Sequence, residues 1–193
     1  MDKMNVKKIA LFASGSGTNA ENIMKYFSGN EHVVVDSLWS NKADAYALKR
    51  AQKWNVETFV FNREQFYHSD EVFTILNNRN IDLIVLAGFL WLIPSNLVQH
   101  FTILNIHPAL LPKYGGKGMY GMNVHKAVVA SGDKESGISV HYVNDKYDEG
   151  KLIFQAKCPV FSSDTAEDVA EKIHALEYEH FPKVIERVLT GKQ

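Results

Sequence analysis

The sequence is poor in cysteine, in net charge and in long hydrophobic runs, and each shortage excludes a class of protein. The single cysteine, Cys158, cannot form an internal disulfide bond, which favours a reducing compartment such as the cytoplasm. The formal net charge of −1 provides no overall attraction to nucleic acid or to a membrane surface. No apolar run approaches the ~20 residues that a membrane-spanning helix needs. The first residues lead directly into a strand-like segment and predict no signal peptide.

The rest of the composition is that of an ordinary globular protein. Hydrophobic residues make up 46% of the 193 residues and charged residues 22%. The chain contains no linker, repeat or low-complexity tract that would mark a boundary. We therefore expect one domain, residues 1–193, and the sequence leaves open whether it is a monomer or a homodimer.

Short apolar segments alternate with helix-like segments in the first half of the chain. Residues 8–13, 82–87 and 103–107 have the continuous hydrophobicity of buried parallel strands. Two further strands are expected at 33–39 and 58–61, and helices at 19–28, 45–54 and 69–78, with a short one opened by Pro94-Ser95. This alternation predicts an α/β fold with a doubly wound, mainly parallel sheet.

From Pro108 onward the pattern changes. A loop at 113–122, rich in glycine and tyrosine, precedes a helix at 124–131. Two β segments at 138–143 and 152–159 are separated by polar residues, which predicts an antiparallel element near the C-terminal end of the sheet. A final helix is expected at 165–189, kinked or interrupted at Pro182.

A glycine-rich turn, Gly15-Ser16-Gly17-Thr18-Asn19-Ala20, follows the first expected strand. Small residues before a helix N-terminus predict a phosphate site. The spacing also fits a dinucleotide fingerprint with Asp36 as its acid, so an NAD-dependent oxidoreductase is one alternative. Asp36 lies inside an apolar strand, however, and the hydroxyl and amide groups around the glycines suit a phosphate monoester better. A turn without a ligand, or a non-catalytic nucleotide-binding module, are further alternatives.

The segment Asn105-Ile106-His107-Pro108 predicts a reaction centre. Asn105 and His107 are two residues apart on a strand that Pro108 ends, so both point to one side at the carboxyl edge, where open α/β sheets bind ligands. An amide donor beside an imidazole suits oxyanion stabilisation and proton transfer. Asp148, with Asp145 as second choice, is the expected carboxylate that raises the pKa of His107. A buried histidine satisfied by backbone is the structural alternative.

Two other kinds of catalytic site find no support in the sequence. His125, His141, His174 and His180 lack a metal-ligand spacing, and Cys158 has no nearby Cys or His partner, so no metal is required. The nucleophile elbow Gly-x-Ser-x-Gly of serine hydrolases is also absent from the sequence.

Six segments together resemble the formyltransferase superfamily, in particular its purine-pathway branch. They are Gly15–Asn19, Ser40–Asp44, Leu86–Phe89, Asn105–Pro112, Gly137–His141 and Gln155–Val160, and they follow the family's order along almost the whole chain. Superfamily members that act on tRNA or deformylate folate carry an additional domain, for which 193 residues leave no room.

The resemblance implies a reaction and a set of residues. The formyltransferase fold would transfer the formyl group of 10-formyltetrahydrofolate, a co-substrate, to the amine of 5-phosphoribosyl glycinamide in de novo purine biosynthesis. It implies no metal, nucleic acid or membrane partner. Asn105, His107 and Asp148 match the catalytic residues; Ser16, Gly17, Thr18 and Asn19 the phosphate site; Glu177 an acceptor contact; and Leu90, Trp91, Leu92, Ile93, Asn105, Asn144, Asp145, Lys146, Tyr147 and Asp148 the folate site. A formyltransferase acting on another amine, such as an amino-sugar nucleotide, is the nearest alternative.

The chain departs from the family pattern at several positions. Trp91 stands where relatives often carry a charged residue, and Asn123 where a histidine is frequent. The loop at 113–122 is longer than in common bacterial relatives. Arg63 and Ser69 are both imperfect matches to an arginine that lies near the third helix in relatives.

Overall fold

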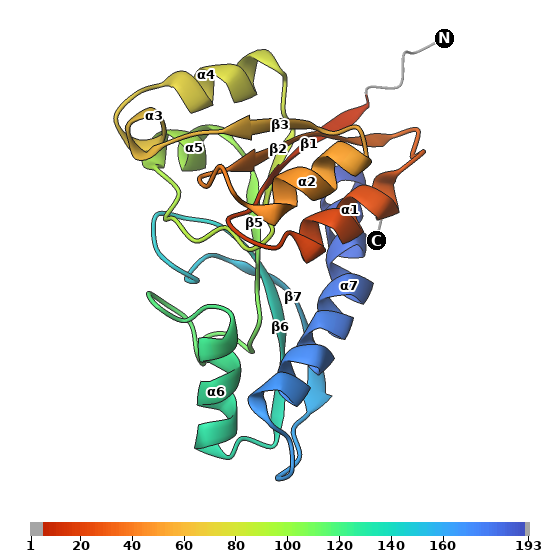
Figure 1. Ribbon diagram of the computed structural model, residues 1–193, viewed down its shortest axis with the longest axis vertical. Coiled ribbons are helices and arrows are strands. Elements are labelled where there is room, and N and C mark those ends of the chain that lie inside the picture. Colours follow the sequence, from red (N-terminus) through yellow and green to blue (C-terminus); the bar gives the residue numbers. More distant parts are fainter. Residues whose placement is uncertain (1–5, 192–193) are drawn as a thin grey trace.

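One mixed sheet organises residues 6–191, the part of the chain that the computed structural model describes (Figure 1). Its strand order is β3-β2-β1-β4-β5-β6-β7. The pairs among β1 to β5 are parallel, and β6 is antiparallel to both β5 and β7. The strands are β1 (Lys7–Phe12), β2 (Val33–Ser40), β3 (Glu57–Val60), β4 (Leu83–Leu86), β5 (Ile103–His107), β6 (Glu135–Tyr142) and β7 (Leu152–Pro159).

Helices cover both faces of this sheet (Figure 1). They are α1 (Thr18–Phe27), α2 (Tyr46–Lys53), α3 (Arg63–Tyr67), α4 (Glu71–Asn78), α5 (Ser95–His100), α6 (Met122–Ser131) and α7 (Ala166–Thr190). One core contains buried residues of α1, α2 and α7, and the other contains Phe66, Leu76 and Leu97 from α3, α4 and α5. Alternate residues of the central strands enter the two cores, as Ile9 and Ala10 of β1 do.

The predicted α/β sheet and its antiparallel C-terminal element are therefore confirmed. The sequence pattern did not predict α3, which has only five residues. Asn62 starts this helix by a capping box: its side chain accepts from Gln65 N, and the Gln65 side chain accepts from Asn62 N, both at 2.9 Å. Residues 1–5, on which the absence of a signal peptide was argued, and residues 192–193 of the expected domain lie outside the described residues.

The expected interruption of the last helix at Pro182 was wrong, because α7 continues through it. Proline has no N–H, so residue 182 cannot donate the helical hydrogen bond to the carbonyl of Tyr178. Asn22 of α1 supplies a replacement, since its Nδ2 donates to that carbonyl at 3.0 Å. The defect in α7 is thus compensated by a contact with α1, and it links the first helix to the last.

We expect Asn22→Ala to lower the free energy of unfolding by ~0.5–1 kcal/mol, because the Tyr178 carbonyl loses its donor. Pro182→Ala restores a helical donor to this carbonyl, so Asn22→Ala should cost clearly less in that background. Denaturant unfolding of the wild type, both single variants and the double variant measures the difference. An equal cost of Asn22→Ala in both backgrounds would contradict the compensation.

Candidate active site

A cavity lies where β1, β4 and β5 end, beside the point at which the strand order reverses between β1 and β4. Its volume is about 620 Å³. Parallel sheets bind ligands at such a reversal because the loops after the two strands separate there. The cavity is lined by the glycine-rich turn, by residues 86–93, by 105–108 and by parts of the loop before α6, together with His141, Tyr147, Asp148, His174 and Glu177.

The glycine-rich turn presents the N-terminus of α1 to this cavity. Gly17 precedes the helix with φ +73°, a conformation that L side chains rarely adopt, and an added Cβ would lie 2.5 Å from Cβ of Ala47. Arg50 fixes the turn from outside, because its Nε donates to the carbonyl of Ser16 at 2.9 Å. No side chain caps α1, so the first N–H groups and the positive end of the helix dipole can accommodate an anion.

Ser14 connects this turn to the loop after β4. Its hydroxyl donates to Oδ1 of Asn41 at 2.7 Å and accepts from the N–H of Leu90 at 3.1 Å. Its own N–H donates to the carbonyl of Gly88 at 3.0 Å. The predicted phosphate and folate segments are therefore bound to one another through a single buried serine.

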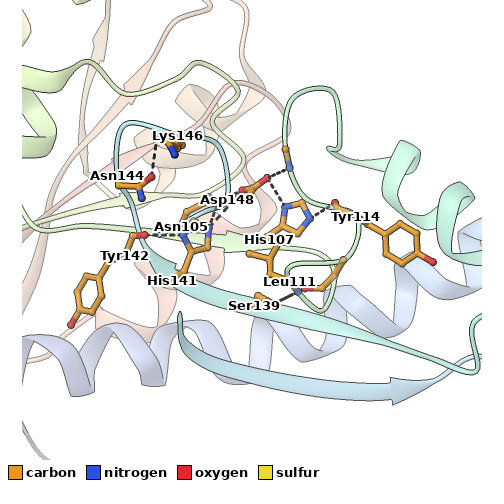
Figure 2. A network of polar contacts seen from close by, with 12 residues as sticks. Asn105, His107, Leu111, Tyr114, Ser139, His141, Tyr142, Asn144, Lys146 and Asp148 are labelled. Carbon is orange, nitrogen blue, oxygen red and sulfur yellow. Dashed lines mark hydrogen bonds and ion pairs between the residues drawn. The ribbon is translucent and has the colours of Figure 1, made fainter. Parts of the chain in front are cut away.

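Asp148 brings four predicted or neighbouring polar groups together (Figure 2). One carboxylate oxygen, Oδ2, lies 3.5 Å from Nδ1 of His107 and accepts from Gly116 N–H at 2.9 Å. The other, Oδ1, lies 3.4 Å from Nδ2 of Asn105 and 3.6 Å from Nε2 of His141. The predicted association of Asn105, His107 and Asp148 is thus present in the structure, in a cluster where both histidines are buried.

The backbone around Asp148 is specialised for this placement. Asp148 has φ +56°, which aspartate and asparagine tolerate better than most residues. Gly116, whose N–H it accepts, has φ +96°. The carbonyl of Tyr114 accepts from Nε2–H of His107 at 2.7 Å. Two backbone groups of the loop before α6 therefore orient the carboxylate and the imidazole.

Burial lowers the pKa of His107 below its usual value, although the Asp148 carboxylate and the Tyr114 carbonyl act in the opposite direction. Our expectation that Asp148 raises this pKa was therefore right in the sign of the interaction but wrong in the net result. Stability contributed by neutral His107 is present above the ordinary histidine pKa and is lost as the pH falls toward the lowered value. In the free protein near neutral pH, the ring is neutral.

Burial alone would raise the pKa of Asp148, but its contacts lower it overall. The contact with His141 and the N–H of Gly116 stabilise the carboxylate, and His107 does so whenever its ring is protonated. Asp148 is therefore ionised, and its stabilising effect is lost only as the pH falls through this depressed value.

His141 was considered in the sequence only as a metal ligand, and its place in this cluster was missed. It lies opposite Asn105 in the β5–β6 pairing, so strand register could have revealed it. Its Nδ1 donates to the Tyr142 carbonyl at 2.8 Å, which leaves Nε2 to accept from Asn105 at 3.2 Å. This histidine orients the amide of Asn105.

The remaining predicted residues lie at different distances from the reaction centre. Buried Glu177 accepts from Nδ2 of Asn19 and from Nδ1 of His174, both at 2.9 Å, and so connects α7 to the glycine-rich turn. Ser16, Gly17, Thr18, Asn19, Leu90, Trp91, Leu92, Ile93 and Tyr147 line the cavity. Asn144, Asp145 and Lys146 do not line it; Asn144 accepts from the Lys146 N–H at 3.0 Å (Figure 2).

Trp91, one of the departures from the family pattern, lines the cavity, and Arg63 lies beside it. Trp91 packs against Phe61, Phe66 and Tyr67, and the guanidinium of Arg63 lies over its ring, 4.9 Å from the centroid. The hydroxyl of Ser69, by contrast, donates to the Gln65 carbonyl.

One alternative from the sequence, the dinucleotide-binding oxidoreductase, loses support. Asp36, the acid required by a dinucleotide site, is paired with Arg79 at 2.6 Å and lies 3.7 Å from Lys8. Among residues 6–191, no three His, Cys, Asp or Glu side chains are arranged to hold a metal ion. Over the same range, no helix has the length and hydrophobicity to span a membrane.

Comparison with known proteins found a matching family, similar sequences and similar structures. A family model described as formyl transferase matches residues 7–185. The phosphoribosylglycinamide formyltransferase of Haemophilus influenzae is 38% identical, covering 97% of this chain and 89% of that protein. The chloroplastic enzyme of the same name from Arabidopsis thaliana is 40% identical, covering 93% of this chain and 64% of its own length. The crystal structure of glycinamide ribonucleotide transformylase 1 from Symbiobacterium toebii superposes with a TM-score of 0.86 at 32% identity, covering 96% and 89% of the two chains.

Replacing Asp148 with Asn should lower the pKa of His107 further, because the carboxylate is the charge that raises it. Asparagine also tolerates the positive φ at this position, so the turn should persist. Titration of the histidine ring resonances by NMR in both proteins measures the change.

His174, which is hydrogen-bonded to Glu177, is the internal control. Its pKa is raised mainly by that bond and should be the same in both proteins. An unchanged His107 titration in Asp148→Asn would mean that the two side chains are not electrostatically coupled.

Proposed function

We infer the reaction from family membership. The chain belongs to the formyl transferase family and, within it, to the phosphoribosylglycinamide formyltransferases. It transfers the formyl group of 10-formyltetrahydrofolate to the amine of 5-phosphoribosyl glycinamide. The products are formylglycinamide ribonucleotide and tetrahydrofolate, and the step belongs to de novo purine biosynthesis. The observation that carries this function is the meeting of Asn105, His107 and Asp148 beside a phosphate-type turn in one cavity.

We propose that Asn105 and His107 stabilise the charge that develops on the formyl oxygen. The amine nitrogen forms a bond to the formyl carbon, and the bond from that carbon to the folate nitrogen then breaks. Nδ2 of Asn105 and Nδ1 of His107 both lie next to the Asp148 carboxylate. A formyl oxygen bound beside this carboxylate, within reach of both nitrogens, meets two donors once the ring is protonated. Nε2–H of His107 is already engaged by Tyr114.

Asp148 and burial have opposite effects on the pKa of His107, and this balance changes during the reaction. The ring is neutral in the free enzyme because burial outweighs the carboxylate. Negative charge on the formyl oxygen adds a second anion beside the ring, which favours the imidazolium when the transition state needs it. The amine proton leaves to the departing folate nitrogen, through water, so that the site returns to its initial protonation.

The two substrates approach this centre from opposite ends of the cavity. We propose that the phosphate binds to Ser16, Gly17, Thr18 and Asn19 and that Glu177 contacts the ribose or glycinamide part. The folate is assigned to Leu90, Trp91, Leu92 and Ile93 and to Asn144–Asp148. The bridge through Ser14 supports this arrangement, because it fixes the two segments relative to one another. Positioning two substrates together supplies up to ~7–11 kcal/mol of a barrier.

We also propose that residues 1–193 act as one nucleotide-binding domain in the cytoplasm. A single sheet and a family match over residues 7–185 support one domain. One cysteine and the absence of a membrane-spanning helix among residues 6–191 are consistent with the compartment.

The test is a two-substrate assay for tetrahydrofolate release. His107→Ala should reduce kcat by about 10²–10³-fold, as expected when one oxyanion donor is removed. Asp148→Asn should also reduce kcat strongly, because the imidazolium loses its partner carboxylate.

His100→Ala is the matched control, because this exposed histidine of α5 does not line the cavity and contacts the carbonyl of its own helix neighbour Asn96 and the ring of Phe73. Its kcat should equal that of the wild type. An amino-sugar nucleotide, offered in place of glycinamide ribonucleotide, should not be formylated. Failure of the wild type to release tetrahydrofolate, or full activity of His107→Ala, would refute the proposal.

A further inference from the structure

His125 is a buried histidine whose two ring nitrogens have no hydrogen-bond partner among the described residues. Its side chain is 2% exposed, and its Nδ1 is sealed from solvent without a partner. Within residues 6–191, the only other buried side-chain atom of this kind is Oγ of Ser136. A buried polar atom left without a hydrogen bond costs ~1–3 kcal/mol, so its presence needs an explanation.

The position of His125 does not require a polar side chain. Val124, His125 and Val128 form the buried face of α6, where a leucine or phenylalanine would pack without unsatisfied nitrogens. Unlike Ser136, His125 lines the large cavity. Nε2 is the ring nitrogen that is not sealed, so a molecule in the cavity can reach it.

The neighbours of His125 identify which end of the cavity it faces. His107, His174 and Glu177 line the same cavity as His125, and their charges act on its ring when they are ionised. Glu177 is hydrogen-bonded to Asn19 of the glycine-rich turn, whereas His107 belongs to the reaction centre. His125 therefore lines the part of the cavity shared with Glu177, which contacts the glycine-rich turn, and with His107.

The ring is suited to an uncharged hydroxyl partner rather than to a phosphate. Burial lowers the pKa of His125, and His174 adds to this effect while Glu177 opposes it. A neutral imidazole offers one donor and one acceptor, which match a ribose hydroxyl, itself both donor and acceptor.

We propose that His125 is a binding residue for the acceptor, with its Nε2 hydrogen-bonded to a ribose hydroxyl of glycinamide ribonucleotide. The bond gives a partner to Nε2, and it sets the distance between the anchored phosphate and the amine at His107. Nδ1 stays sealed without a partner, so the cost of burying it is the cost of presenting Nε2 to the cavity. This assignment rests on the proposed function for the identity of the acceptor.

The experiment compares His125→Phe with the wild type by calorimetry and by steady-state kinetics. We expect the Kd and the KM for glycinamide ribonucleotide to rise about tenfold or more, because the ribose hydroxyl loses its partner. The KM for 10-formyltetrahydrofolate should stay unchanged. The Tm should be equal or higher, because the substitution removes a buried unsatisfied nitrogen.

Two further variants separate binding from packing. His125→Gln places an amide near the position of Nε2 and should keep the Kd for glycinamide ribonucleotide within about threefold of the wild type. Ser136→Ala removes the other unpartnered buried atom, away from the cavity, and should leave every kinetic constant unchanged.

The outcomes distinguish this inference from the proposed function. If the wild type is active and His125→Phe keeps its Kd and KM for glycinamide ribonucleotide, the inference fails alone. It also fails if His125→Phe lowers only the Tm, since the residue is then structural. If the wild type binds glycinamide ribonucleotide but transfers no formyl group, the proposed reaction fails and the calorimetric Kd values still decide the role of His125. If it does not bind this nucleotide, both fail.

Discussion

The carboxylate of Asp148 is the group on which the rest of the site depends. It lies between two buried histidines, His107 and His141, and accepts from Gly116 and Asn105. Burying a carboxylate is costly unless its oxygens are paired, and here each oxygen accepts from one N–H donor, of Gly116 or of Asn105, and lies beside one imidazole. Without this charge, the amide of Asn105 and the imidazole of His107 would have no common point of orientation.

Burial and the Asp148 carboxylate shift the pKa of His107 in opposite directions. A desolvated imidazole resists protonation, while an adjacent carboxylate promotes it, and in the free protein desolvation is the stronger effect. Such a balance leaves the ring close to a change of charge that a developing oxyanion can complete. A site with His107 exposed beside Asp148 would be protonated more readily, but its hydrogen bonds would be weakened by water.

The sequence predicted the sheet and the central residues because these follow from local patterns. Continuous apolar runs identified β1, β4 and β5, and Pro108 placed Asn105 and His107 at a carboxyl edge. What escaped prediction depends on tertiary contacts. Burial decides the direction in which the pKa of His107 is shifted. Strand register decides that His141 lies beside Asn105. Continuity of α7 through Pro182 is supported by Asn22, which lies far away in the sequence, on the first helix. The lack of a hydrogen-bond partner at Nδ1 of His125 likewise depends on the surrounding fold and could not be read from the sequence.

The loop before α6 contributes backbone, rather than side-chain, chemistry to the centre. Its carbonyl at Tyr114 and its N–H at Gly116 are two residues apart, and one fixes His107 while the other fixes Asp148. The path of this main chain is therefore what the centre requires, and the positive φ of Gly116 is part of that path. A chimaera that receives this loop from a relative with a different loop length would therefore misalign His107 and Asp148, whatever side chains the new loop carries. Exchange of the loop between homologues would succeed only if the donor segment reproduces this two-residue spacing.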